Sequence, residues 1–260
     1  MQRRDLLILA AAAPLGLRAQ VVDIADAINK AGRQRMLSQR MGKAWLALVH
    51  QTEGRSAQAV LDKSMALFDR QLAELKAFAP SPEIRETYTA LESAWSDYKG
   101  TLVGAAPTRA SAPAVLKVDA RVLALAHQGT QQYEAVMGRP VGKLVNVAGR
   151  QRMLSQRMAK FYYAATLPVD TPNAVAEIGK ARTEFLAAMT TLRDAPEATA
   201  RIRDELSLAD GQWFFFDQAL QRVQSGAAAS AKPMSDVFVT SENLLSVMDR
   251  VTELYANLKS

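Results

Sequence analysis

An arginine-rich segment that occurs twice carries the chemistry this sequence could do. Residues 29–43 read Asn-Lys-Ala-Gly-Arg-Gln-Arg-Met-Leu-Ser-Gln-Arg-Met-Gly-Lys, and thirteen of these fifteen residues recur in order at 146–160. The central arginines of the two copies are Arg35 and Arg152. A guanidinium keeps its proton in proteins and presents a planar fork of N–H donors, which suits a planar or tetrahedral oxyanion. Functional constraint on this chemistry would explain the identity of the copies, and recent gene conversion is the competing explanation.

Both arginines fall on an apolar seam if the segments are helical. Residues 24, 28, 31, 35, 38, 42, 45 and 49 are spaced alternately by four and three, and the second copy repeats the pattern. Small residues beside each arginine would let a second helix come close. If the two helices face each other, Arg35 and Arg152 converge and need an anion, because an unpaired buried charge is expensive. No acid occurs between positions 26 and 53 or between 134 and 170, so the anion is a ligand or a carboxylate from another helix.

Structural roles compete with this hypothesis. Arg35 and Arg152 could form salt bridges with distant acids. The arginines at 33, 40, 150 and 157 lie off the seam and are expected to face solvent or to pair with neighbouring helices. The methionines of the repeat are expected in the core. The two histidines, His50 and His127, lie outside the repeat and are expected at the surface or partly buried.

Glycines and prolines divide the chain into two sets of four helical stretches that would position these arginines. The expected helices span 22–52, 56–78, 82–103, 112–137, 141–166, 172–193, 196–224 and 233–258. Single residues outside the segment also recur at nearly the same spacing, for example Trp95 as Trp213 and Tyr133 as Tyr255, so the duplication covers the whole chain. The predicted fold is all-α, with two tandem up-down four-helix bundles over residues 20–137 and 138–260. The motifs could meet within one chain, or the bundles could lie end to end so that a homodimer is needed.

Composition excludes several functional classes. The chain has 260 residues, a formal net charge of +6 and no cysteine, which rules out disulfides, thiolate metal sites and cysteine nucleophiles. Basic residues are interspersed with acids, so a nucleic-acid partner is not expected. The sequence has no catalytic triad arrangement, phosphate-binding glycine loop or metal-ligand cluster. We therefore expect no enzyme activity, no cofactor and no metal.

The first nineteen residues are typical of an export signal. Two arginines at positions 3 and 4 precede an apolar stretch of twelve residues that ends near Ala19, which is too short to span a bilayer. The paired arginines resemble a twin-arginine signal, and export by the general secretory route is the alternative. These features predict cleavage near Ala19 and a periplasmic mature protein without a membrane span.

The repeated residues resemble a known family. The pattern Ala-Gly-x-x-Arg-Met-x-Ser-x-Arg at Ala31–Arg40 and Ala148–Arg157 is similar to the P-box of NarX/NarQ-type nitrate and nitrite sensor domains, and the fuller string resembles the PilJ-type domain of type IV pili chemotaxis transducers. The resemblance implies four-helix sensor bundles that pair through their first helices and hold nitrate between them. It places the ligand at Gly32, Arg35, Gly149 and Arg152, with support from Ala31, Arg33, Ser38, Gln39, Ala148, Arg150, Ser155 and Gln156.

Two functions remain open at this point. The first is a periplasmic oxyanion sensor, with nitrate or nitrite favoured, that passes its ligand state to a membrane receptor or sensor kinase in signal transduction or chemotaxis. The internal duplication would then replace the usual homodimer. The second is an adaptor without a ligand, whose seam docks on a helix of a membrane receptor or of a pilus or chemotaxis component.

Overall fold

Eight helices make up the secondary structure of the described part of the chain. A computed structural model describes residues 20–104, 106–167, 171–223 and 230–258, so the predicted export signal at 1–19 lies outside the described residues. The helices are α1 (Ile24–Val49), α2 (Gly54–Phe78), α3 (Pro82–Gly104), α4 (Ala112–Met137), α5 (Pro140–Ala165), α6 (Thr171–Asp194), α7 (Ala200–Gln221) and α8 (Ala231–Ala256). The prediction of an all-α fold is confirmed. None of the described helices is long and apolar enough to cross a membrane.

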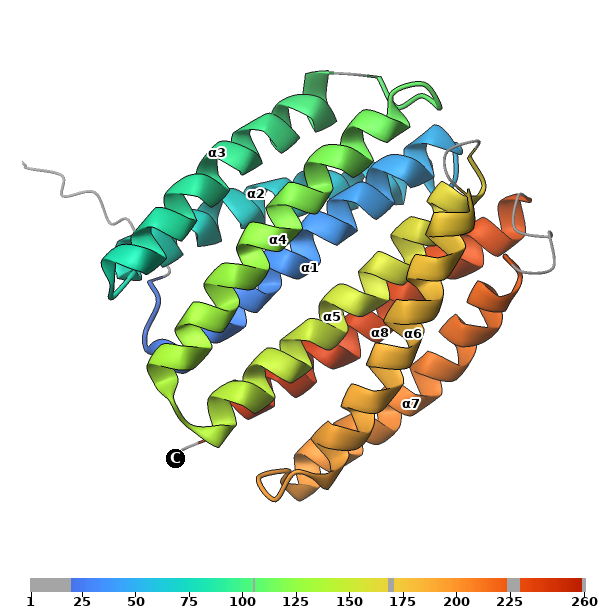
Figure 1. Ribbon diagram of the computed structural model, residues 1–260. Helices are drawn as coiled ribbons and strands as arrows, with labels where there is room; N and C mark the ends of the chain where they lie inside the picture. The colour runs from blue at the N-terminus through green and yellow to red at the C-terminus, as the bar shows by residue number, and fades with distance from the viewer. Residues whose placement is uncertain (1–19, 105, 168–170, 224–229, 259–260) are drawn as a thin grey trace, which may run out of the picture.

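Local sequence signals set the helix ends. The side chain of Asp23 accepts a hydrogen bond from the backbone N–H of Asp26 at 2.8 Å and caps α1. Gly138 ends α4 in the left-handed conformation, with φ at 62°, and Pro140 starts α5 two residues later. The chain reverses direction at this joint, so α4 and α5 run antiparallel (Figure 1).

The first helices of the two repeats lie side by side at the centre of the molecule. We call α1–α4 the first repeat and α5–α8 the second. Helix α1 packs against α5, α2 and α4, and α5 packs against α1, α6 and α8, while α3 and α7 lie on the outside (Figure 1). Gly32 on α1 faces its counterpart Gly149 on α5. Toward the two ends of the pair, Gly142 lies against Ile28 and Gly42 against Lys160, so the two helices run parallel and in register (Figure 1). The two motifs therefore meet within one chain, and the end-to-end arrangement does not occur.

Duplicated aromatic residues anchor both repeats. Phe68 stacks on Trp95 with ring centroids 4.3 Å apart, and Phe185 stacks on Trp213 at 4.5 Å. The hydroxyl of Tyr133 donates to the carbonyl of Leu75 at 2.8 Å. In the second repeat, Tyr255 donates to the carbonyl of Leu192 at 2.5 Å. Corresponding residues are thus 117 positions apart for α2 and α6, as in the repeated segments of α1 and α5, 118 apart for α3 and α7, and 122 apart for α4 and α8.

A glycine on the outer helix α3 gives a simple test of the helix assignment. Gly100 is exposed, and a Cβ added there would meet no atom within 4 Å. Gly100→Ala should stabilise the protein by about 0.5–1 kcal/mol, because alanine restricts the unfolded backbone and favours the helix. Urea denaturation monitored by circular dichroism would measure this gain. A loss of stability would show that residue 100 is not in an open helical environment.

Candidate anion-binding site

The centre of the site is the contact between two glycines. A Cβ on Gly32 would lie 3.2 Å from Nη2 of Arg35, 3.6 Å from Nη2 of Arg152 and 3.8 Å from the Cα of Gly149. A Cβ on Gly149 would similarly lie 3.2 Å from Nη2 of Arg152. Glycine at both positions lets the helices approach and leaves room for the two guanidinium groups. The structure therefore brings the four predicted ligand residues together.

Each central arginine crosses to the opposite helix. Arg35 and Arg152 have no exposed surface. Nη2 of Arg35 donates to the side-chain and backbone oxygens of Asn146 at 2.7 and 3.3 Å, and Nη2 of Arg152 donates to the backbone carbonyl of Asn29 at 3.0 Å. In both arginines Nε is buried and makes no hydrogen bond in the described part of the chain. Two like charges thus converge in the interior, as the seam pattern predicts.

The two arginines differ in how their charge is compensated. Nη1 of Arg152 donates to Asp249 on α8 at 2.5 Å, and the same carboxylate oxygen accepts from Arg33 at 3.1 Å. One of the two roles expected from the sequence, a salt bridge with an acid far along the chain, is therefore confirmed for Arg152. Nη1 of Arg35 instead lies 3.2 Å from Nδ1 of His127 on α4, and no carboxylate contacts Arg35 among the residues that the structure describes.

The pKa values of both central arginines are lowered, and the partners of each side chain explain by how much. Burial, followed by repulsion from Arg150 and Arg152, lowers the pKa of Arg35 to about 9, although the attraction of Glu134 opposes the change. Burial also lowers the pKa of Arg152 to about 10, although the attraction of Asp249 opposes the change. Both side chains remain charged at neutral pH. No carboxylate contacts Arg35 directly in the described structure, and Glu134 reaches it through Asn146, whose amide donates to Glu134 and accepts from Arg35.

His127 acts as a hydrogen-bond acceptor toward this charge. Because a guanidinium can only donate, Nδ1 of His127 must be unprotonated and the ring proton must reside on Nε2. Burial, then the charges of Arg35 and Arg150, lowers the pKa of His127 to about 4, so the ring is neutral at neutral pH. The sequence predicted that His127 lies at the surface or is partly buried, which is correct, but it did not predict that the ring contacts Arg35.

The supporting residues of the repeat have mainly structural contacts. Ala31 and Ala148 are buried in the helix pair. Ser38 and Ser155 donate to the backbone carbonyls of the arginines three residues earlier, at 2.9 and 2.8 Å. Amide groups from the repeat reach the fourth helix of each unit: Gln39 donates to Asp119 at 2.7 Å and Gln156 to the carbonyl of Ser241 at 3.0 Å.

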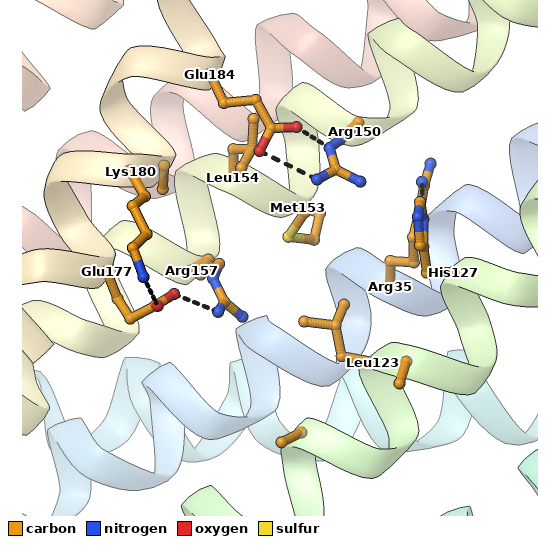
Figure 2. A pocket seen from close by; sticks show the side chains of 13 residues that line it. Arg35, Leu123, His127, Arg150, Met153, Leu154, Arg157, Glu177, Lys180 and Glu184 are labelled. Carbon is orange, nitrogen blue, oxygen red and sulfur yellow. Dashed lines mark hydrogen bonds and ion pairs between the residues drawn. The ribbon is translucent and has the colours of Figure 1, made fainter. Parts of the chain in front are cut away.

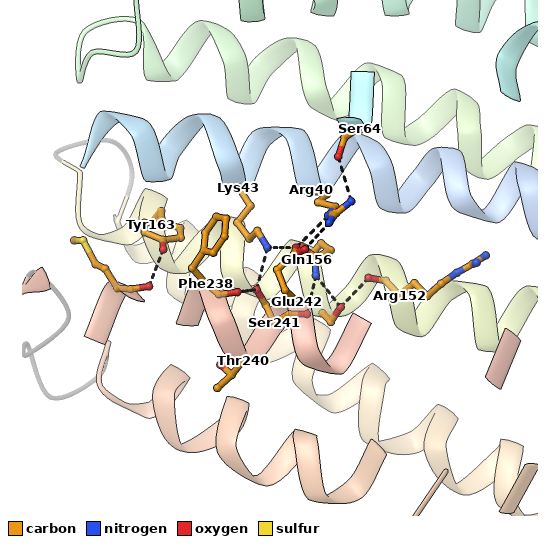
Figure 3. Close-up of polar contacts among 12 residues, drawn as sticks. Arg40, Lys43, Ser64, Arg152, Gln156, Tyr163, Phe238, Thr240, Ser241 and Glu242 are labelled. Carbon is orange, nitrogen blue, oxygen red and sulfur yellow. Dashed lines mark hydrogen bonds and ion pairs between the residues drawn. The ribbon is translucent and has the colours of Figure 1, made fainter. Parts of the chain in front are cut away.

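Two buried lysines next to the site were not predicted. Lys43 donates to the hydroxyl of Ser241 at 3.0 Å and to Glu242 at 2.6 Å (Figure 3). Its counterpart, Lys160, forms a buried ion pair with Asp119. Lysine is the last residue of the repeated segment in both copies, and this identity was the available signal.

A groove opens beside Arg35 between α4, α5 and α6. It has a volume of about 390 Å³, and its lining includes Arg35, His127 and Arg150 at one end (Figure 2). Arg150 is held by Glu184, and further along the groove Arg157 is held by Glu177 at 2.5 Å. The off-seam arginines are therefore paired with neighbouring helices, one of the two roles expected for them.

No cluster of histidine, aspartate and glutamate side chains suited to a metal ion is found among the described residues. The groove instead offers nitrogen donors around one uncompensated guanidinium. Such a set can bind a small anion through charge-assisted hydrogen bonds.

Comparison with known proteins agrees with the duplication. Searches against curated proteins and against solved structures give no match. The family model described as the type IV pili methyl-accepting chemotaxis transducer N-terminal domain, PilJ, matches residues 18–121 and again 137–254, one match for each repeat. The two segments cover most of the chain, so this protein belongs to the PilJ family and carries two copies of its helical sensory domain.

Proposed function

We propose that the chain is a periplasmic oxyanion sensor of the PilJ family and that it passes its ligand state to a membrane receptor. The single observation that carries this proposal is Arg35, a fully buried guanidinium with no carboxylate partner in the described structure. A bound anion would supply the missing charge. Membership of a chemotaxis transducer family supports a receptor as the partner.

Nitrate and nitrite are the favoured ligands. Both are planar oxyanions that match the fork of a guanidinium, and the resemblance of the repeat to nitrate sensor domains points the same way. In this proposal the anion binds on the Arg35 side of the helix pair, because Asp249 already compensates Arg152. One ligand per chain is expected.

Calorimetric titration with nitrate, nitrite, sulfate and phosphate tests this proposal. Arg35→Met should abolish nitrate binding and change the free energy of unfolding by only about 1 kcal/mol, since an uncompensated buried charge adds little stability. Arg193→Met is the matched control, because Arg193 forms an exposed ion pair with Asp210. Equal binding of nitrate by the wild type and Arg35→Met would refute the role of Arg35, and no heat from any of the four anions would refute the sensor.

A second candidate function, docking to a receptor without a ligand, is favoured by one surface. The seam is used for pairing α1 with α5 and is not free for a partner. Helix α7, however, exposes Leu208, Phe214 and Phe215, each by more than half. Their counterparts on α3 are Ala90, Ser96 and Asp97, since Trp213 corresponds to Trp95. Phe214→Ser with Phe215→Asp should weaken receptor binding and leave anion binding unchanged if this surface docks.

A further inference from the structure

The groove beside Arg35 is larger than an inorganic oxyanion requires. Its volume is about 390 Å³, whereas about 10–15 Å³, measured in the same way, holds one water molecule. Polar side chains lie in two layers that are separated by seven residues on α5 and on α6, about 10 Å along the axis. The first layer contains His127, Arg150 and Glu184, and the second contains Arg157 and Glu177 (Figure 2).

The wall between these layers is mostly apolar. Leu123 and Ala124 contribute from α4, Met153 and Leu154 from α5, and Ala181 from α6. Pockets of this composition, with a few polar groups at one end, are typical of sites for organic ligands. The groove is thus suited to a molecule with a charged head and an apolar body.

The internal duplication explains why this groove is open. On α8 the counterparts of Ala120 and His127 are Glu242 and Asp249. Glu242 reaches α1 and accepts from Lys43 at 2.6 Å, so its side chain spans the space between the helices. Alanine and a neutral histidine at the α4 positions cannot make these contacts.

The arginine beside the groove pairs with a different helix from its counterpart in the first repeat. In the first repeat, Arg33 contacts Asp249 on α8 at 3.1 Å. Its counterpart Arg150 contacts Glu184 on α6 instead. The carboxylate partner therefore lies on the fourth helix in one repeat and on α6 in the other, and no acid of α4 lines the groove. In the described part of the chain, Arg35 has no carboxylate in direct contact, whereas its counterpart Arg152 has Asp249.

We propose that the groove binds the carboxylate of an amphipathic organic acid, with the head group at the Arg35–His127–Arg150 end and the apolar body along Leu123 and Met153. The head would take the place that Asp249 has in the second repeat, where one carboxylate oxygen bridges Arg152 and Arg33. Arg35 and Arg150 are the counterparts of these two arginines. The head would, however, reach Arg35 through the ring of His127, which occupies Nη1 of Arg35. This inference rests on the proposed function and names the ligand class of the same site.

Two donors are available for the head group. Nη1 of Arg150 makes no hydrogen bond in the described part of the chain, since its Nε and Nη2 bind Glu184. The Nε2–H of His127 is likewise without a described partner, and Arg35 behind the ring polarises it. The lining as a whole carries four cationic side chains against two acids: Arg35, Arg150, Arg157 and Lys180 against Glu177 and Glu184. This balance favours an anion.

A homologous series of acids tests the inference on the full chain. We would titrate the protein calorimetrically with nitrate, acetate, butyrate and hexanoate, and with hexylammonium as the cationic control. Affinity should rise on the order of threefold for each methylene from acetate to hexanoate, because each one enters an apolar wall. Hexylammonium should not bind. Equal affinities for acetate and hexanoate would overturn the inference, whereas nitrate binding could still uphold the sensor.

A variant whose side chain fills part of the groove distinguishes binding of an organic acid from binding of nitrate. Ala124 is exposed on α4 and lines the groove, so Ala124→Leu should preserve the fold and occupy part of the space. It should weaken hexanoate at least tenfold and leave nitrate unchanged. Ala135→Leu, at an exposed position of α4 outside the groove, is the matched control. Unchanged hexanoate binding by Ala124→Leu would contradict the inference, and failure of every anion to bind the wild type would remove both proposals.

Discussion

Asp119→Ala should destabilise the protein by about 3–5 kcal/mol, the largest effect expected for any single carboxylate in this fold. Asp119 has no exposed surface, and it forms an ion pair with Lys160, whose side chain is only 2% exposed. It also accepts from Gln39 at 2.7 Å. Removal of the carboxylate leaves the buried ammonium of Lys160 without this partner and takes one of two acceptors from the amide of Gln39, which also donates to Ser38. Urea denaturation followed by circular dichroism would give the difference.

A double variant separates loss of the ion pair from loss of packing. Asp119→Ala combined with Lys160→Met should be less destabilised than the sum of the single variants, because no unpaired charge remains. The exposed pair of Asp97 and Arg121 provides the control, and Asp97→Ala should change stability by less than about 1 kcal/mol. If Asp119→Ala were no worse than Asp97→Ala, the buried network would not exist as described.

Gly32→Leu should destabilise the protein by about 3 kcal/mol and abolish anion binding. The added side chain would start 3.2 Å from Nη2 of Arg35 and 3.8 Å from the Cα of Gly149, so either the guanidinium groups or the two helices must separate. Separation of α1 from α5 would open the interface between the repeats. Thermal unfolding and nitrate titration of the same sample would report both effects.

Gly100→Leu is the matched control for this variant, because the space around Gly100 is open. It should be as stable as the wild type or slightly more stable, since leucine favours a helix over glycine. Equal stability of Gly32→Leu and Gly100→Leu would mean that close approach of α1 and α5 is not required.

The fold could be predicted from the sequence because its signals are local or duplicated. Helix limits depend on caps, glycines and prolines, and α4 begins and ends at the predicted residues. The start predicted for α7 at Pro196 was too early, because the helix begins after Thr199, whose side chain caps it. The inward direction of Arg35 and Arg152 followed from the heptad spacing, which does not depend on distant parts of the chain.

The asymmetry of the site could not be predicted in the same way. Asp249 lies far from Arg152 in the sequence, and only the packing of α8 on α5 brings the two together. The counterpart of Asp249 is His127, but the repeats are offset by 117 positions at the motif and 122 at the fourth helix, which hid the correspondence. The pair of Tyr133 and Tyr255 already carried this offset in the sequence, but it was not applied to His127, and the equivalent hydrogen bonds of the two tyrosines confirm it.

His127→Asp tests most directly whether the first repeat lacks the carboxylate that the second repeat provides to its central arginine. This change places on α4 the residue that compensates Arg152 from α8. Thermal unfolding of the wild type and the variant should be recorded with and without nitrate. We expect the variant to unfold about 2–6 °C higher than the wild type, consistent with a gain of about 1–2 kcal/mol, and to lose the stabilisation by nitrate. A variant that is less stable than the wild type and still responds to nitrate would contradict the account.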